Sequence, residues 1–303
     1  VVVYVGTVWC GPCKRLKATT FKDKAFAQLV NQRMIPLSLD AEKGLGKPFA
    51  KKYKITSFPT LMFLRPDGTE IDRAFGYRSP AQMTRLSTDM LAGRGTITDL
   101  RKRLAKRPDD LPLRFRIAQH LAMRGDVEEA AQMLQGIVTR DPQNAKGFAS
   151  RALLVLARHV HRSKRRDNAA AAIVYKDLLE RFPKSGQART AAVDLATLLA
   201  QRKDRAAALT VIRNMVAAVP KDFARKLDAV AAVLRLRLDP KPAIPWARAV
   251  LKQRPDARSW YLLGETLRRS GDKKGAVKAL REATQRAPNN RRYRAALEAD
   301  RRP

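Results

Sequence analysis

The sequence predicts an α/β domain followed by an all-α domain of repeated helix pairs. Over residues 1–93, short apolar runs rich in β-branched residues alternate with segments of helical spacing. From about residue 96 the strand signals stop, and Ala, Leu and Arg dominate. Prolines then recur at intervals of 33 to 41 residues, which is typical of a helical repeat. A chain of 303 residues is long enough for two domains, each with its own core.

The first domain is predicted to run strand, helix, strand, helix, strand, strand, helix. The strands are expected at residues 1–6, 35–39, 60–64 and 70–75. Pro66-Asp67-Gly68 has the composition of a tight turn between the last two strands. The first helix is expected to begin at Gly11, break near residue 20 and resume over 23–32, and later helices are expected at 46–53 and 80–91.

The only two cysteines of the chain, Cys10 and Cys13, fall where the first strand gives way to the first helix. Proline is tolerated in the first turn of a helix, so Gly11-Pro12 begins that helix. Cys10 is therefore expected at the helix N-terminus, where the dipole and free N–H groups stabilise a thiolate. Cys13 lies one turn further on, within disulfide reach. This pattern predicts dithiol–disulfide chemistry.

Two other uses of the cysteine pair are less favoured. A zinc site would need two further ligands, and the three histidines lie far downstream in a different type of segment, at His120, His159 and His161. A purely structural disulfide over so short a loop would constrain the unfolded chain little.

The stretch Trp9–Lys14 reads WCGPCK, the signature hexapeptide of thioredoxins, and the element order resembles the thioredoxin fold. Ser57-Phe58-Pro59-Thr60 stands where that family has its cis-proline. The resemblance implies a cis Phe58–Pro59 peptide beside Cys10, where a substrate segment can pair as an added strand. It implies Cys10 and Cys13 as the catalytic residues and no metal or cofactor beyond their redox-active disulfide. The expected substrate contacts are Trp9, Gly11, Pro12, Phe58 and Pro59.

One position departs from the thioredoxin pattern. The family usually buries a carboxylate six residues before the first cysteine, where it helps to deprotonate the second cysteine. Tyr4 occupies that position here, and Pro36 stands where small thioredoxins have the partner lysine. The proton acceptor for Cys13 is therefore left open.

The second domain resembles an all-α superhelical solenoid of tetratricopeptide repeats (TPR). Residues 257–290 carry the repeat pattern from Trp260 to Pro288, and small Gly264 and Ala276 should let the paired helices approach closely. Helix-ending prolines are expected at Pro108, Pro142, Pro183, Pro220, Pro255 and Pro288. We expect a linker and docking helix over 94–110, about five repeats over 111–290 and a polar capping helix over 291–303.

The formal net charge of +34 favours acidic partners. The repeats imply a groove for a protein or peptide ligand, with Arg258, Arg268 and Arg269 able to attract an acidic segment, although simple solvation of these arginines is favoured. The dense basic run Arg158–Arg166 is expected to be a solvated loop between helices, and a binding patch is the less favoured alternative. Nucleic acid is a less favoured partner, and no apolar run is long enough for a membrane span.

These features predict a thioredoxin-like protein-disulfide oxidoreductase whose repeats recruit a protein substrate with a disulfide. The Gly-Pro between the cysteines resembles reducing members of the family, so reduction is favoured. The alternative is a TPR adaptor or chaperone-like protein whose dithiol is vestigial or regulatory. Because the chain begins inside a strand, its N-terminus is expected to be incomplete, and the resemblance to exported thioredoxin-like proteins favours the bacterial periplasm or cell envelope over the cytoplasm.

Overall fold

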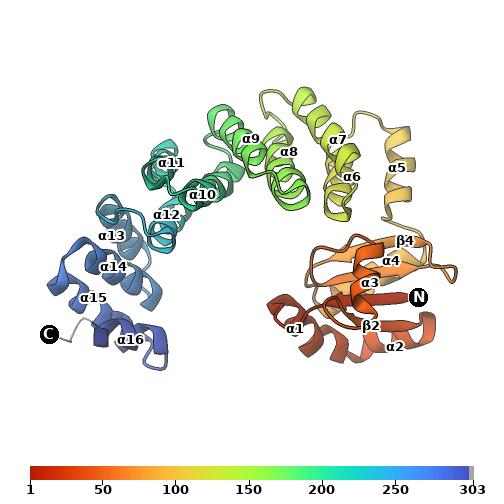
Figure 1. The fold of residues 1–303 in the computed structure, drawn as a ribbon, viewed down its shortest axis with the longest axis horizontal. Coiled ribbons are helices and arrows are strands. Elements are labelled where there is room, and N and C mark those ends of the chain that lie inside the picture. Colours follow the sequence, from red (N-terminus) through yellow and green to blue (C-terminus); the bar gives the residue numbers. More distant parts are fainter. Residues whose placement is uncertain (300–303) are drawn as a thin grey trace. The chain divides into compact units, whose positions relative to one another are not determined.

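A computed structural model describes residues 1–299 of the chain (Figure 1). It confirms an α/β domain followed by helix pairs. By packing, the chain divides into two units, Val1–Thr139 and the part from Arg140 onward. The domain boundaries expected from the sequence stay predictions. No helix among residues 1–299 combines the length and the apolar character that crossing a membrane requires.

The first unit contains a four-stranded sheet in the order β2-β1-β3-β4. Strand β1 pairs in parallel with β2 and antiparallel with β3, which pairs antiparallel with β4. All four predicted strands are present, with ends shifted by one residue at most. They are β1 (Val2–Gly6), β2 (Pro36–Asp40), β3 (Thr60–Leu64) and β4 (Glu70–Phe75).

Capping side chains mark the starts of α2 and α4. Asp23 Oδ1 accepts the Phe26 N–H at 2.9 Å, and Ser79 and Gln82 form a capping box. The predicted break near residue 20 is a short 3₁₀ turn. The elements are α1 (Gly11–Ala18), η1 (Thr20–Lys22), α2 (Lys24–Arg33), α3 (Gly46–Lys52) and α4 (Pro80–Leu91).

The central strand β1 supplies core side chains to both faces of the sheet. Val3 and Val5 pack in a cluster with residues of α3, whereas Val2 and Tyr4 pack in the cluster that holds α1, α2 and α4. This alternation follows from the two-residue period of a strand. It places Tyr4 on the same face of the sheet as both cysteines.

A buried carboxylate joins the sheet to the helices that follow it. These are α5 (Ile97–Lys106), α6 (Leu111–Arg124) and α7 (Val127–Arg140). Asp72 of β4 is fully buried, and its Oδ2 accepts the Ile97 N–H at the start of α5 at 2.7 Å. Its Oδ1 lies 3.4 Å from His120 Nε2 and 3.8 Å from Arg124 Nη1 on α6. The Asp72 carboxylate thus fixes α5 and α6 against the edge strand of the sheet.

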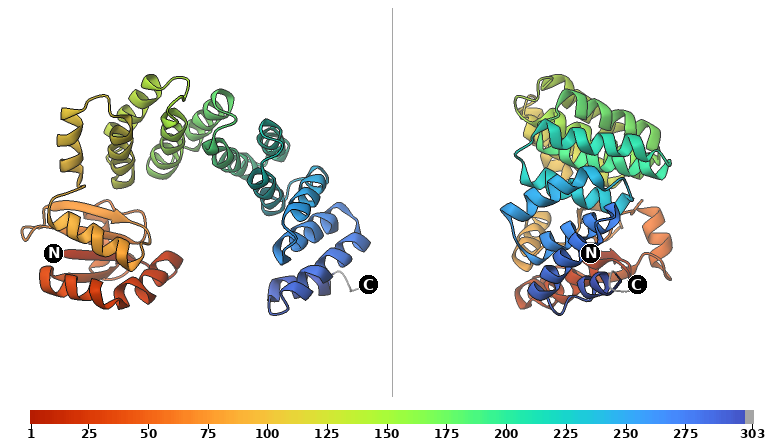
Figure 2. Two further views of the ribbon diagram at one scale, coloured as in Figure 1. Left: turned by 180° about the vertical axis from the view of Figure 1, so that it is seen from behind. Right: turned by 90° about the vertical axis from the view of Figure 1, so that its left-hand side faces the viewer.

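From α8 onward, successive helices lie side by side in pairs (Figure 1 and Figure 2). One continuous apolar core runs from Ala192 to Leu297. The helices are α8 (Phe148–Val155), α9 (Asn168–Arg181), α10 (Gly186–Gln201), α11 (Arg205–Ala218), α12 (Phe223–Leu236), α13 (Ile244–Gln253), α14 (Ala257–Ser270), α15 (Lys273–Arg286) and α16 (Arg291–Ala299). A 3₁₀ turn, η3 (Lys241–Ala243), precedes α13.

The predicted helix-ending prolines are confirmed. Each stands two residues after the last residue of a helix, from Pro108 after α5 to Pro288 after α15. Proline disfavours the helical conformation in the residue before it, so a helix stops ahead of an X-Pro bond.

The expectation of a solvated loop over Arg158–Arg166 is wrong. Residues Leu156–Arg165 continue α8 as a π-helical segment, η2. The helical spacing of Leu156, Ala157 and Val160 buries one face of this segment, and Arg158 Nε lies 3.0 Å from Asp194 Oδ2. The basic run therefore lengthens a helix instead of forming a loop.

Helix α16 covers the last repeat, with Tyr293 stacked on Tyr261 at 4.7 Å between ring centroids. Residues 300–303 of the predicted capping segment lie outside the described residues.

The contact between α14 and α15 generates a stability prediction. A Cβ on Gly264 would lie 2.7 Å from Leu280 Cγ, so a larger side chain must separate the helices. Gly264→Val should lower the free energy of unfolding by about 1–3 kcal/mol, measured by urea denaturation. Gly186→Ala is the matched control, since a Cβ there meets nothing within 4 Å. Equal stability of the two variants would contradict this packing argument.

Candidate active site

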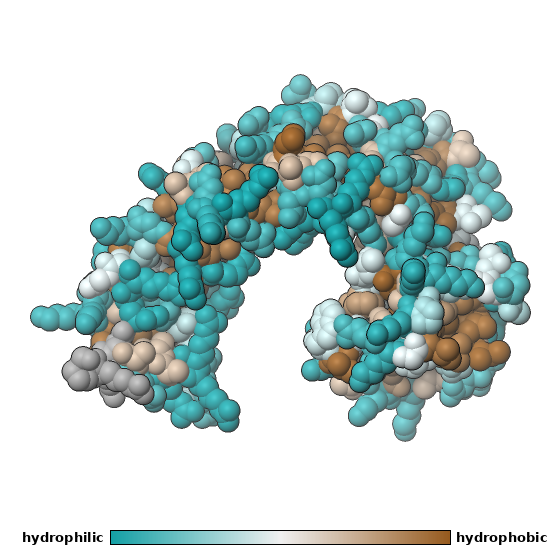
Figure 3. Space-filling view, viewed as in Figure 1, coloured by the Kyte–Doolittle hydropathy of each residue, from teal (hydrophilic) through white to brown (hydrophobic). Residues whose placement is uncertain are grey.

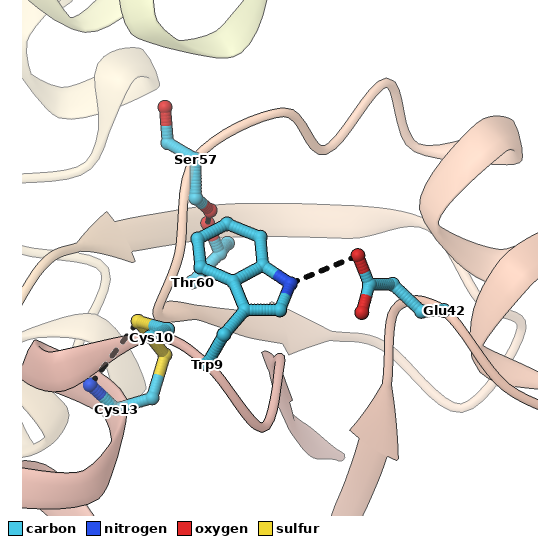
Figure 4. Close-up of a disulfide and its surroundings, with 6 residues drawn as sticks. All are labelled: Trp9, Cys10, Cys13, Glu42, Ser57 and Thr60. Carbon is cyan, nitrogen blue, oxygen red and sulfur yellow. Dashed lines mark hydrogen bonds between the residues drawn. A yellow bond between two sulfur atoms is a disulfide. The ribbon is translucent and has the colours of Figure 1, made fainter.

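The two cysteines form a disulfide at the carboxyl end of β1. Their Cα atoms are 5.2 Å apart, and Cys10 is the N-cap residue of α1, as its sequence position predicts. The Cys13 N–H donates to Cys10 Sγ at 3.2 Å (Figure 4). A backbone donor and the positive end of the helix thus point at the sulfur, which is the arrangement that stabilises a thiolate.

Cys10 is the more exposed of the two cysteines. Cys10 keeps 5% of its surface exposed and Cys13 keeps 1%, so Cys10 is the one nearer to solvent. Gly11 and Pro12 are the first two residues of α1, and both are exposed beside Cys10. They border the disulfide as expected, and their contact with substrate stays a prediction.

Trp9 forms an apolar surface next to the disulfide. Its side chain is 63% exposed, and its Nε1–H donates to Glu42 Oε1 at 3.0 Å (Figure 4). The ring also packs edge-on against Phe58, with ring centroids 6.1 Å apart. A hydrogen bond and a ring contact therefore hold an exposed indole in place, although Trp9 makes no large contribution to the core. The contact of Trp9 with substrate stays a prediction.

The segment before β3 completes the site. The Phe58–Pro59 peptide is cis, as the resemblance implies, and Phe58 packs against the cluster that contains both cysteines. Thr60 Oγ1 donates to the Ser57 carbonyl at 2.7 Å, which fixes the turn (Figure 4). The structure thus brings together the distant residues that the sequence singled out, 9–13 and 58–59.

The phenol of Tyr4 packs in the same core cluster as both cysteines, at the sequence position where thioredoxins have a carboxylate. Tyr4 is 4% exposed, and its hydroxyl has no hydrogen-bond partner. Burial, with a smaller effect from the Asp40 carboxylate, raises the pKa of Tyr4 above its usual value. Pro36 is exposed at the start of β2 and pairs in register with Val2, so it contributes no polar group here. Sequence reasoning found this departure but not the position of the hydroxyl.

The arginines expected to attract an acidic ligand at α14 are partly engaged within the protein. Arg268 Nη2 and Arg269 Nε lie 2.9 Å and 3.8 Å from Glu265 Oε2, and Arg269 Nη1 donates to the Leu234 carbonyl at 2.6 Å. Arg258 is exposed at the start of the helix. Because two of the three arginines are paired within the protein, α14 is a weaker candidate for binding an acidic ligand.

A polar cavity of about 360 Å³ lies instead between η2, α10 and α12. We call it the arginine pocket; its charged lining residues are Arg158, Arg162, Asp194, Asp228 and Arg235. Asp194 accepts the Tyr175 hydroxyl at 3.1 Å and faces Arg158 and Arg162. Arg235 Nη2 lies 3.4 Å from Thr197 Oγ1, at the long end of a hydrogen bond. The sequence marks only the basic run that holds Arg158 and Arg162, because the other lining residues come from α10 and α12.

Comparisons with known proteins agree with this architecture. Residues 1–91 match a family described as a thioredoxin-like domain, and residues 92–164 and 239–291 each match a family described as a tetratricopeptide repeat. No curated protein matches the chain significantly.

Several solved structures are similar to parts of the chain. A thioredoxin from Thermus thermophilus is 24% identical, with a TM-score of 0.29, over 31% of this chain and 75% of its own. A disulphide-isomerase candidate from Bacteroides thetaiotaomicron is 34% identical, with a TM-score of 0.29, over 31% of this chain and 78% of its own. YrrB, a TPR protein with an unusual peptide-binding site, is 17% identical, with a TM-score of 0.46, over 67% of this chain and 98% of its own.

The family matches cover both parts of the chain, and the disulfide at the N-terminus of α1 lies in the first of them. The chain therefore has a thioredoxin-like domain at its N-terminus, followed by tetratricopeptide repeats.

Proposed function

We propose that this protein is a thiol–disulfide oxidoreductase that reduces disulfides in protein substrates. The observation that carries the proposal is the Cys10–Cys13 disulfide at the N-terminus of α1, with a backbone N–H aimed at Cys10 Sγ. A sulfur held in this way is a stabilised thiolate once the disulfide is reduced, and the thiolate is the nucleophile of disulfide exchange.

The proposed cycle has two exchange steps. The Cys10 thiolate attacks one sulfur of the substrate disulfide, forms a mixed disulfide and releases the other substrate sulfur as a thiolate. The Cys13 thiolate then attacks Cys10 Sγ and releases the second substrate thiolate, which leaves the protein with its internal disulfide. An external thiol reductant must return the two electrons before the next cycle. The greater exposure of Cys10 supports its role as the attacking residue.

Cysteine variants test this proposal. Cys10→Ser should abolish the reduction of insulin disulfides, because no attacking thiolate remains. Cys13→Ser should instead accumulate a covalent mixed disulfide with substrate, visible on a non-reducing gel. Ser38→Ala, at an exposed position of β2, is the control and should retain full activity. Undiminished turnover by Cys10→Ser would sink the proposal.

A second function, a TPR adaptor with a vestigial or regulatory dithiol, is favoured by one observation. Tyr4 replaces the buried carboxylate that thioredoxins use near the second cysteine. The adaptor function requires that a variant lacking both cysteines still prevents the aggregation of a client protein. Loss of this protection, together with measurable turnover by the unmodified protein, would decide for the enzyme.

We further propose that the repeats recruit an acidic peptide segment through the arginine pocket. Hydrophilic side chains dominate the visible surface of the repeats (Figure 3), and the chain carries a net charge of +34. Within the pocket, Asp194 faces Arg158 and Arg162, and Asp228 lies 3.0 Å from Arg189 Nη1. Arg235 makes only a long contact with Thr197, which supports its guanidinium as the group that meets a ligand carboxylate.

This recruitment generates a binding prediction. Arg235→Ala should weaken the binding of a fluorescein-labelled Glu-rich peptide about tenfold, as measured by fluorescence anisotropy. Arg213→Ala, at an exposed position of α11 outside the pocket, removes the same charge and serves as the control. The same loss in both variants would mean that net charge, rather than the pocket, attracts the peptide.

A further inference from the structure

The Tyr4 hydroxyl is a buried polar group with an unmet hydrogen bond. The side chain is 4% exposed, and its hydroxyl has no partner in a structure that holds the oxidised cysteine pair. Buried hydroxyls nearly always have a partner, since desolvation without one is costly. A disulfide sulfur is a weak acceptor, whereas a thiolate is a strong one. The hydroxyl is therefore suited to the reduced form of the site.

Gly6 locates this hydroxyl relative to the second cysteine. A Cβ built on Gly6 would lie 2.1 Å from Tyr4 Oη and 3.2 Å from Cys13 Sγ. Both atoms therefore border the same small volume. The distance between Tyr4 Oη and Cys13 Sγ cannot exceed the sum of these two distances. Any side chain at position 6 would occupy that volume. Glycine at this position in β1 leaves no side chain between the phenol oxygen and the sulfur.

We infer that Tyr4 is a positioning residue for the resolving step, in which its hydroxyl donates a hydrogen bond to the Cys13 thiolate. This inference rests on the proposed function, because only disulfide exchange needs that thiolate. Tyr4 thereby takes the place of the carboxylate that is absent from this site, but as a hydrogen-bond donor rather than as a base.

The step balances without a further reactant. The Cys13 thiol releases its proton to solvent, and the resulting thiolate accepts the hydrogen bond from Tyr4, which keeps its own proton. Cys13 Sγ then attacks Cys10 Sγ, the bond between Cys10 and the substrate sulfur breaks, and the substrate leaves as a thiolate. Tyr4 is neither oxidised nor reduced in this step.

The surroundings of Tyr4 keep it in the donor form. Phe21 packs edge-on against its ring, and the Asp40 carboxylate acts on it from β2, whereas the Lys17 ammonium, 5.2 Å from the ring centre, has the opposite effect. Burial and Asp40 raise the pKa of Tyr4, so the phenol stays protonated through the neutral range. A protonated phenol can stabilise an adjacent thiolate but cannot accept its proton.

Tyr4→Phe tests the inference, because it removes the hydroxyl and keeps the ring. In a Cys10→Ser background, the pKa of Cys13 is measured from the pH dependence of its ¹³Cβ chemical shift. Loss of a hydrogen bond to a charged group should raise that pKa by about one to two units. Tyr53→Phe is the matched control: its hydroxyl donates to the Gly68 carbonyl at 2.8 Å, in the same unit but away from Cys13.

The rate of resolution gives a second measurement, in the protein with both cysteines. With Ellman's reagent in stopped flow, the second release of thionitrobenzoate reports the attack of Cys13 on the mixed disulfide. Tyr4→Phe should slow this phase about threefold to tenfold at pH 7, because a smaller thiolate fraction is partly offset by higher nucleophilicity. The deficit should disappear at a pH above the raised pKa of Cys13, where the thiol ionises without help.

The outcomes separate the two proposals. An unchanged pKa of Cys13 in Tyr4→Phe, or a deficit that persists at high pH, overturns the role of Tyr4 and leaves the proposed function standing. A raised pKa in a protein that reduces no substrate disulfide supports the hydrogen bond and overturns the proposed function. An equal shift in Tyr53→Phe would identify a general effect on stability and overturn the inference.

Discussion

The position of β1 between two neighbouring strands is the constraint on which the rest of the first unit depends. A strand paired on both sides has no free edge, and its residues alternate between two buried faces. The run of β-branched residues at the start of the chain suits this environment. Because only Thr7, Val8 and Trp9 separate the end of β1 from Cys10, the pairing that fixes the strand also limits where α1 begins. The position of the disulfide is thus a consequence of sheet pairing.

The two sulfurs consequently have different surroundings. Cys10 is the N-cap residue of α1 and accepts a backbone N–H, so its thiolate is stabilised by groups that exist whenever the helix exists. Cys13 lies inside the first turn and is buried, and we propose that a side chain of the sheet stabilises its thiolate. The alternation of β1 directs Tyr4 toward the interior. An attacking sulfur and a resolving sulfur can therefore be tuned separately, one by the backbone and one by a side chain.

The features that the sequence predicted well are those set by local chemistry. The prolines after α5, α7 and α15 stop helices through contacts with their immediate neighbours, and Cys10 is placed by the helix start at Gly11-Pro12. The prediction of a loop over 158–166 is wrong because the charges of this run obscure the helical spacing of its apolar residues. The arginine pocket and the contacts of Asp72 could not be predicted, since they join side chains from elements far apart in the sequence. Gly6 offered one overlooked signal: a glycine within a buried strand indicates close approach of another group.

Charged side chains of the repeats serve the fold as well as the surface. Six aspartates of the described repeats accept backbone N–H groups as N-cap residues, at Asp110, Asp167, Asp204, Asp222, Asp256 and Asp272. A carboxylate at a helix N-terminus balances the positive end of the helix dipole, and Asp110 and Asp256 also lie 3.6 Å and 2.7 Å from the guanidinium groups of Arg107 and Arg254. Arg225, by contrast, is buried and donates to the carbonyls of Pro183, Met215 and Ser185, so it serves the fold. Most other basic side chains lie at the surface, where like charges repel one another and oppose folding. The acidic peptide segment that we propose for the arginine pocket would relieve part of this repulsion on binding.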